Sequence, residues 1–121
     1  MHDKVNIAAV QMEPRIMAKR ENLDKIVLGA RTAANNGADL IVFPECALTG
    51  YVFTSRKEAM PYMETIPGPT TDKLAACCRE LGVHLVVGLI EIDNDRCFNA
   101  AVLIGPDGLV ERSRWFTVPP V

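Results

Sequence analysis

A single glutamate occupies the most informative position in the sequence. Glu45 follows directly after the apolar residues 40–43 (Leu-Ile-Val-Phe) and Pro44. A short, wholly apolar run of this kind favours a buried strand of a parallel sheet, and α/β folds place their ligand crevices at the carboxyl ends of such strands. Partial burial there would raise the pKa of the Glu45 carboxyl toward the range of a general base. The alternative is a solvated loop glutamate, the commoner situation for this residue type.

The cysteines are weaker candidates for chemistry. Cys46 adjoins Glu45, but neighbouring residues near a strand end point in opposite directions, so a thiol–carboxylate pair is disfavoured and Cys46 is interpreted as a small buried residue. Cys77, Cys78 and Cys97 fall in apolar patterns and are interpreted as packing residues. Neither they nor the two histidines have the clustered spacing of a metal site, and we expect no metal.

Hydrophobic periodicity predicts the elements that position Glu45. Residues 5–12 form an apolar run too short for a helix, and we expect a buried strand there. Residues 19–36 place their apolar positions on one helical face, and Gly37 supplies the left-handed residue that commonly ends a helix. A second strand follows at residues 40–43. Strand, helix and strand within about forty residues imply a right-handed crossover and a parallel pair.

The second half of the chain predicts two helices and three strands. We expect a short helix at 54–63, capped by Thr54 or Ser55, and a longer one at 70–81. Strands are predicted at residues 84–92, 97–104 and 109–114, and the turns between them are too short for crossover helices, so these strands should run antiparallel. The predicted fold class is α/β, a mixed sheet with helices on one face, without an internal domain boundary.

Composition excludes several classes of function. The chain has 121 residues, 23% of them charged, and a formal net charge of −2. Without a basic patch, nucleic acid is not expected as a partner, and no apolar run reaches the length of a membrane span. The four cysteines lack the spacing of a disulfide framework and no secretory signal is evident, so we expect a reduced, cytoplasmic protein.

Common catalytic and nucleotide-binding motifs are missing from the sequence. It contains no GxGxxG, no GxxxxGK[ST], no GxSxG and no HExxH. A doubly wound nucleotide-binding domain would need a glycine-rich loop after the first strand, where the chain instead has Met-Glu-Pro-Arg at residues 12–15. This alternative is therefore disfavoured.

Four segments carry a resemblance to a known family. They are AAVQMEP (residues 8–14), GADLIVFPECALTGY (37–51), IPGPTTDKLAACCRELGVHLVVGLIE (66–91) and CFNAAVLIGPDGLV (97–110). Their order and motifs resemble the N-terminal portion of the nitrilase superfamily of carbon–nitrogen hydrolases. The resemblance implies a nitrilase-type α-β-β-α sandwich, of which residues 1–121 form a partial domain, truncated at the C-terminus and amounting to about the first half. It also implies homo-oligomers and no cofactor.

The resemblance assigns a catalytic role to Glu45. In the family a glutamate takes the proton of a cysteine, the thiolate attacks a small amide, nitrile or N-carbamoyl substrate, and a lysine stabilises the developing negative charge. The family's glutamate corresponds to Glu45. By analogy Cys46 and Tyr51 are expected to line the entrance of the substrate pocket, whereas Asn99 is expected to fasten strands.

Two departures from the family pattern bear on activity. Trp115 stands where the family has its lysine, and no lysine follows Lys73. The family's cysteine nucleophile lies on a downstream segment that has no counterpart here. We therefore expect this chain, as a truncated or frameshifted piece, to be inactive alone. The alternative is a non-catalytic binding or interaction module of the same lineage.

Overall fold

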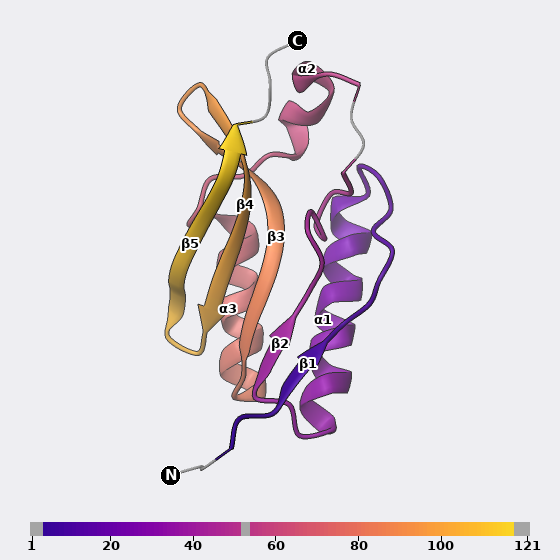
Figure 1. Cartoon of the computed structure of the whole chain (residues 1–121), viewed down its shortest axis with the longest axis vertical. Coiled ribbons are helices and arrows are strands. Elements are labelled where there is room, and N and C mark those ends of the chain that lie inside the picture. The colour runs from indigo at the N-terminus through magenta and orange to yellow at the C-terminus, as the bar shows by residue number, and fades with distance from the viewer. Residues whose placement is uncertain (1–3, 52–53, 118–121) are drawn as a thin grey trace.

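The computed structural model describes residues 4–51 and 54–117, which form one mixed sheet with two principal helices (Figure 1). The elements are β1 (Ile7–Ala9), α1 (Lys19–Asn35), β2 (Leu40–Val42), α2 (Arg56–Ala59), the 3₁₀ helix η1 (Met60–Tyr62), α3 (Pro69–Leu81), β3 (His84–Asp93), β4 (Arg96–Gly105) and β5 (Gly108–Thr117). The strands lie in the order β1-β2-β3-β4-β5. The first three run parallel and the last three antiparallel, which confirms the predicted sheet.

Helices α1 and α3 cover one face of the sheet (Figure 1). The core between them joins Ile26 of α1 and Leu74 of α3 to alternate residues of β3, Leu85, Val87 and Leu89, all of which are buried. The period-2 alternation of a strand and the 3.6 period of a helix therefore place the apolar residues on facing surfaces.

The opposite face of the sheet is apolar and partly open. It carries five apolar residues that alternate with the core positions: Ile7, Leu40, Val42, Val86 and Leu103. We call these five residues the open face. Ile7 is 65% exposed and the other four are half-buried. No helix within the described residues lies over them (Figure 1).

The predicted and observed elements differ mainly at the ends. The first strand, expected over residues 5–12, spans Ile7–Ala9, although the Val10 N–H still donates to the Val42 carbonyl at 2.9 Å. It is short because β1 lies at the edge of the sheet formed by the described residues, and its partner there, β2, has three residues. The last strand extends beyond 114, since it pairs with β4 as far as Thr117. None of the helices in the described ranges has the length and hydropathy needed to cross a bilayer.

A buried carboxylate joins the N-terminal ends of α1 and α3. Glu64, 6% exposed, accepts a hydrogen bond from the Thr70 N–H at 2.8 Å and another from the Thr70 hydroxyl, and its Oε2 lies 2.6 Å from Lys19 Nζ. The first N–H groups of a helix lack intrahelical partners, so Glu64 satisfies a donor that α3 would otherwise leave buried and unpaired. No local pattern in the sequence indicates this contact.

We expect Glu64→Gln to destabilise the fold in a pH-dependent way. Burial by itself raises the pKa of Glu64, but the hydrogen bonds from Lys19 and Thr70 outweigh it, and the pKa is lowered from its ordinary value of 4.5. A lowered folded-state pKa stabilises the fold above the unfolded-state pKa, and that contribution is lost as the pH falls. At pH 7 the variant should lose roughly 1.5–3 kcal/mol of the free energy of unfolding.

The measurement is urea unfolding of Glu64→Gln and wild type at pH 7 and at several values below 4.5. The difference in the free energy of unfolding between wild type and Glu64→Gln should decrease as the pH falls. A pH-independent difference would contradict the assigned role. Glu80→Gln is the matched control, because Glu80 forms an ion pair with Arg31 at the exposed surface.

Candidate active site

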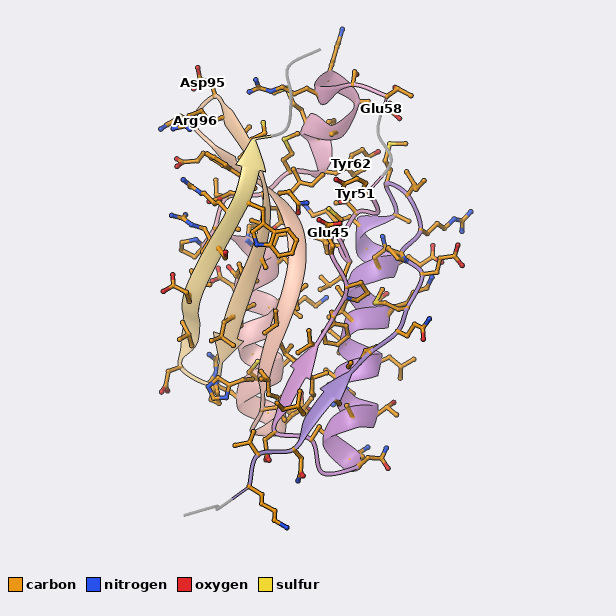
Figure 2. All side chains as sticks on the ribbon, viewed as in Figure 1. Glu45, Tyr51, Glu58, Tyr62, Asp95 and Arg96 are labelled. Atoms are coloured by element: carbon orange, nitrogen blue, oxygen red, sulfur yellow. The ribbon has the colours of Figure 1, made fainter. Side chains whose placement is uncertain are left out.

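Glu45 lies in a turn that begins where β2 ends and folds over β3. The Phe43 N–H donates to the Val86 carbonyl at 2.8 Å, and the Leu48 N–H donates to the Gly88 carbonyl at 3.3 Å. The turn is thus bound to β3 on both sides of Glu45. Figure 2 shows Glu45, Tyr51 and Tyr62 at the same end of the sheet. The predicted position of Glu45, at the carboxyl end of a parallel strand, is confirmed.

Gly88 allows this close approach between turn and strand. A Cβ atom at residue 88 would lie 2.5 Å from the Cys46 nitrogen, 2.8 Å from the Pro44 oxygen and 2.9 Å from the Glu45 Cα. All three are backbone atoms, which cannot rotate away. A glycine inside an otherwise apolar strand often marks such an approach, and this indication was available in the sequence.

We expect Gly88→Ala to displace the turn that carries Glu45. Because the added methyl group meets backbone rather than a flexible side chain, the turn must move, and the free energy of unfolding should fall by about 1–3 kcal/mol. Urea unfolding measures the loss. Amide chemical shifts of residues 44–48 report the displacement.

The control for this substitution is Gly29→Ala, where the nearest atoms to an added Cβ belong to side chains, 3.2 Å away in Phe43 and 3.3 Å in Val10. There the helix-forming preference of alanine offsets the tighter packing. Equal effects of the two substitutions would show that the backbone contact at Gly88 is unimportant.

Asn99 on β4 contacts both candidate residues of the turn. Its Nδ2 donates to Glu45 Oε1 at 2.7 Å, and its Oδ1 accepts from Cys46 Sγ at 3.6 Å. Asn99 is only 5% exposed. The expectation that its side chain fastens strands is wrong: the amide binds the turn. The backbone of β4 already pairs with both neighbours, so the side chain is free to point at Glu45.

The two neighbours Glu45 and Cys46 lie in different environments. Cys46 is 2% exposed and belongs to a buried cluster that includes Ile90 and Cys97. Burial, and secondarily the charge of Glu45, raise the pKa of the Cys46 thiol to about 12, so it stays protonated at neutral pH. Glu45 is exposed, so of the two situations considered for it the solvated one is observed. Both side chains nevertheless reach the same amide, that of Asn99.

Asn22 fixes the turn from its other side. This fully buried residue of α1 donates through Nδ2 to the carbonyls of Arg15 at 2.7 Å and Leu48 at 2.9 Å, and its Oδ1 accepts from the Arg15 N–H at 2.8 Å. Asn22 was not predicted from the sequence. The one feature in the sequence that could have indicated it is its place directly before Leu23, the first apolar residue of the helix face.

The remaining predicted residues lie around this region. Tyr51 is 57% exposed. Trp115, 56% exposed, lies at an irregularity of β5 opposite Asn99 and Ala100, since Phe116 pairs with Asn99 and Arg114 with Ala100. Residue 115 is therefore next to the segment of β4 that carries Asn99. In the described part of the chain, His, Cys, Asp and Glu side chains form no cluster suited to a metal ion.

Comparison with known proteins gives a consistent set of relatives. The family model described as "Carbon-nitrogen hydrolase" matches residues 6–119. A nitrilase of Pyrococcus abyssi is 39% identical over 111 residues, which cover 91% of this chain and 42% of that protein. The human omega-amidase NIT2 is 34% identical over 91 residues, covering 74% of this chain and 32% of that protein. The chain thus spans less than half the length of these relatives.

Solved structures show the same fold. XC1258 from Xanthomonas campestris, described as a CN-hydrolase superfamily protein, superposes with a TM-score of 0.79 at 24% identity, over 94% of this chain and 41% of that one. An N-terminal amidase gives a TM-score of 0.79 at 24% identity, over 91% of this chain and 27% of that one. The mixed sheet with its helices is therefore a known arrangement, of which this chain forms a part.

Proposed function

This chain belongs to the carbon–nitrogen hydrolase family, and we propose that it supplies the general-base portion of a site that hydrolyses a small amide, nitrile or N-carbamoyl compound. The observation that carries the proposal is Glu45, exposed at the carboxyl end of β2 and held at one carboxylate oxygen by Asn99. A fixed, accessible carboxylate can accept a proton from a nucleophile brought next to it.

The proposed reaction has two stages. Glu45 takes the proton of a cysteine thiol, and the thiolate forms a bond to the amide carbon. Glu45 then gives this proton to the nitrogen as the carbon–nitrogen bond breaks, so ammonia or an amine leaves, a thioester remains and Glu45 is again a carboxylate. For a nitrile, the thiolate adds to the nitrile carbon and one water adds to the resulting thioimidate before ammonia leaves. Glu45 then takes a proton from water, which attacks the thioester and releases the acid and the thiol. We assign the thiol to the part of the domain in the longer relatives that the match to residues 1–121 does not cover. Cys46 does not fit, because it is 2% exposed and substrate cannot reach its thiol.

We propose that the 121-residue chain alone has no such activity. Its four cysteines are buried, and Trp115 occupies the position at which the family has a lysine. An uncharged indole cannot stabilise a developing oxyanion as an ammonium does, a contribution of several kcal/mol in comparable sites. Tyr51 and Cys46 are proposed to line the substrate entrance. We further propose that the full-length protein is a cytoplasmic homo-oligomer that acts on a small molecule and has no nucleic-acid or membrane partners.

A chimera tests this function. Residues 6–114 would replace the aligned segment of the P. abyssi nitrilase, whose remaining sequence supplies what this chain lacks. We expect ammonia release from small amides or nitriles by the chimera and none by the 121-residue chain. A second chimera that retains Trp115 in place of the nitrilase residue should lose about 10²–10³-fold in kcat. Ammonia release by the chain alone would refute the proposal.

A non-catalytic interaction module is the second candidate, and the open face favours it. Large exposed apolar surfaces commonly mark contacts with other chains. If this candidate is right, mixing the chain with a full-length relative should increase its hydrodynamic size, whereas an unchanged size would count against it. The two candidates are separable because only the first requires ammonia release by the chimera.

A further inference from the structure

We propose that Asn99 is a positioning residue for Glu45: its buried amide holds the exposed carboxylate in one orientation, and the Cys46 thiol fixes which way the amide faces. This inference rests on the proposed role of Glu45 as general base. It adds a residue that does not touch substrate and acts through its hydrogen bond to Glu45.

An exposed glutamate on a turn needs such a partner. A free glutamate side chain samples several rotamers, and fixing one costs up to about 2 kcal/mol of conformational entropy. Glu45 receives one hydrogen bond, at 2.7 Å, from a side chain that is 5% exposed. The donor stands on β4, whose backbone pairs with β3 on one side and β5 on the other.

The direction of the amide follows from its two neighbours. A carboxylate only accepts hydrogen bonds, so the Asn99 Nδ2, and not its Oδ1, must face Glu45. The Cys46 thiol, 3.6 Å from Oδ1, is protonated at neutral pH and offers a donor to that oxygen. Burial of Cys46 thus has a function in this arrangement: a thiolate there would repel both Oδ1 and Glu45.

The contact leaves one carboxylate oxygen of Glu45 available. Asn99 binds Oε1, and within the described residues no side chain or backbone group donates to Oε2. A carboxylate held at one oxygen and open at the other has the form required of a base that accepts a proton from an incoming group. Asn99 therefore determines which oxygen reacts.

The first test measures the order of the Glu45 side chain in the 121-residue chain. Three-bond NMR couplings across Cα–Cβ and Cβ–Cγ should report a single rotamer in the wild type and averaged values in Asn99→Ala. Asn36→Ala, at the end of α1, is the matched control and should leave the couplings unchanged. Unchanged couplings in Asn99→Ala would overturn the proposal.

An exchange of the two side-chain types guards against simple misfolding. Asn99→Asp should disorder Glu45, because two carboxylates then face each other. In the Asn99→Asp/Glu45→Gln double variant the hydrogen bond can form in the reverse direction, and the residue-45 side chain should regain a single rotamer. If Asn99 has a purely structural role, changing residue 45 to Gln should not restore a single rotamer in the double variant. Failure to restore it would overturn the proposal.

The second test uses the active chimera, so it does not require the short chain to fold alone. Asn99→Ala should lower kcat about 10–100-fold with little change in KM, since a small misplacement of a reacting group can cost that much. An unchanged kcat would overturn the positioning role while leaving Glu45 as the base. Full activity of the Glu45→Gln chimera would instead refute the proposed function itself, so the two failures are distinguishable.

Discussion

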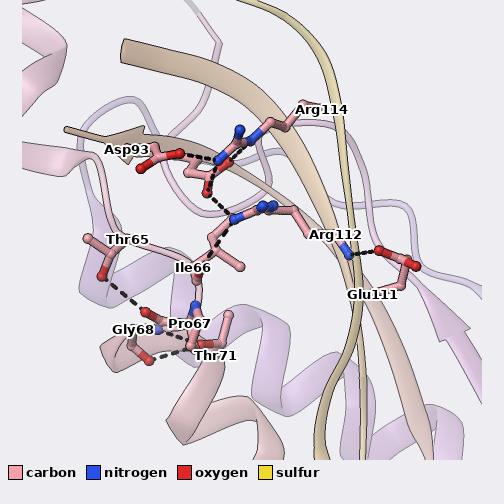
Figure 3. Close-up of polar contacts among 10 residues, drawn as sticks. Thr65, Ile66, Pro67, Gly68, Thr71, Asp93, Glu111, Arg112 and Arg114 are labelled. Carbon is pink, nitrogen blue, oxygen red and sulfur yellow. Dashed lines mark hydrogen bonds and ion pairs between the residues drawn. The ribbon is translucent and has the colours of Figure 1, made fainter. Parts of the chain in front are cut away.

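Glu91→Ala is expected to lose about 3–5 kcal/mol of the free energy of unfolding, a larger loss than either Glu64→Gln or Gly88→Ala should cause. Glu91 is 1% exposed in β3, and its carboxylate accepts from Arg112 Nη1 at 2.8 Å and from Arg114 Nε and Nη2 at 2.7 and 3.0 Å. Figure 3 shows Arg112 and Arg114 with their polar contacts, among them those to Ile66 and Asp93. Removing the Glu91 carboxylate leaves two cations without their buried partner.

The loss should extend beyond one ion pair. Arg112 also donates to the Ile66 carbonyl at 3.3 Å, and the guanidinium of Arg114 lies 4.1 Å from the centre of the Phe98 ring. Glu91 therefore ties β5 and the segment before α3 to the middle of the sheet. Destabilised β5 would also displace Trp115, which follows Arg114 directly.

Urea unfolding with Asp93→Asn as control measures this effect. Asp93 accepts from the same Arg114 at 2.7 Å but its side chain is 49% exposed, so its loss should cost less than about 1 kcal/mol. A Glu91→Ala loss no larger than that of Asp93→Asn would contradict the assignment. If Glu91→Ala does not fold, Glu91→Gln, which keeps the side-chain shape, should give an intermediate loss.

Glu45→Gln in the chimera is expected to lower kcat by about 10²–10⁴-fold, the range that general acid–base groups contribute. The amide has the same shape as the carboxylate but cannot accept a proton. Because Glu45 is exposed, the free energy of unfolding should change by no more than about 0.5 kcal/mol. A large loss of activity without a loss of stability separates a chemical role from a structural one.

Ammonia release and urea unfolding of the same preparations measure both quantities. Glu111→Gln is the matched control: it makes the same chemical change at an exposed residue of β5 and should leave kcat unaltered. Equal kcat values for Glu45→Gln and Glu111→Gln would remove Glu45 from the mechanism.

Most of the sheet could be predicted from local patterns. Strand positions follow from the apolar runs at 40–43 and 84–92, and strand directions follow from the short turns after 92 and 104. Hydrophobic periodicity and turn length can both be recognised in a short stretch of sequence. Strand ends were less predictable. β1 is short because its partner β2 has three residues, and β5 is long because it pairs with β4 as far as Thr117. Neither strand length follows from the residues of that strand alone.

The site was predicted at Glu45 but not around it. Position after an apolar strand identified the residue, yet its exposure depends on how the turn crosses Gly88, a contact between residues more than 40 apart in sequence. The contact of Asn99 with Glu45 also joins residues distant in sequence. The residues around an asparagine in a strand do not indicate which group its side chain will bind. Glu64 and Asn22 were missed because buried polar contacts are defined only once helices and loops are packed.

The most direct measurement of the central claim is the location of the acyl group during turnover. The chimera is mixed with substrate, quenched in acid and digested for peptide mass spectrometry. We expect the acyl adduct on a cysteine from the nitrilase portion. In the Glu45→Gln chimera this adduct should be absent. No adduct is expected on Cys46, Cys77, Cys78 or Cys97. An adduct on any of these four, or one that forms equally in the Glu45→Gln chimera, would contradict the account.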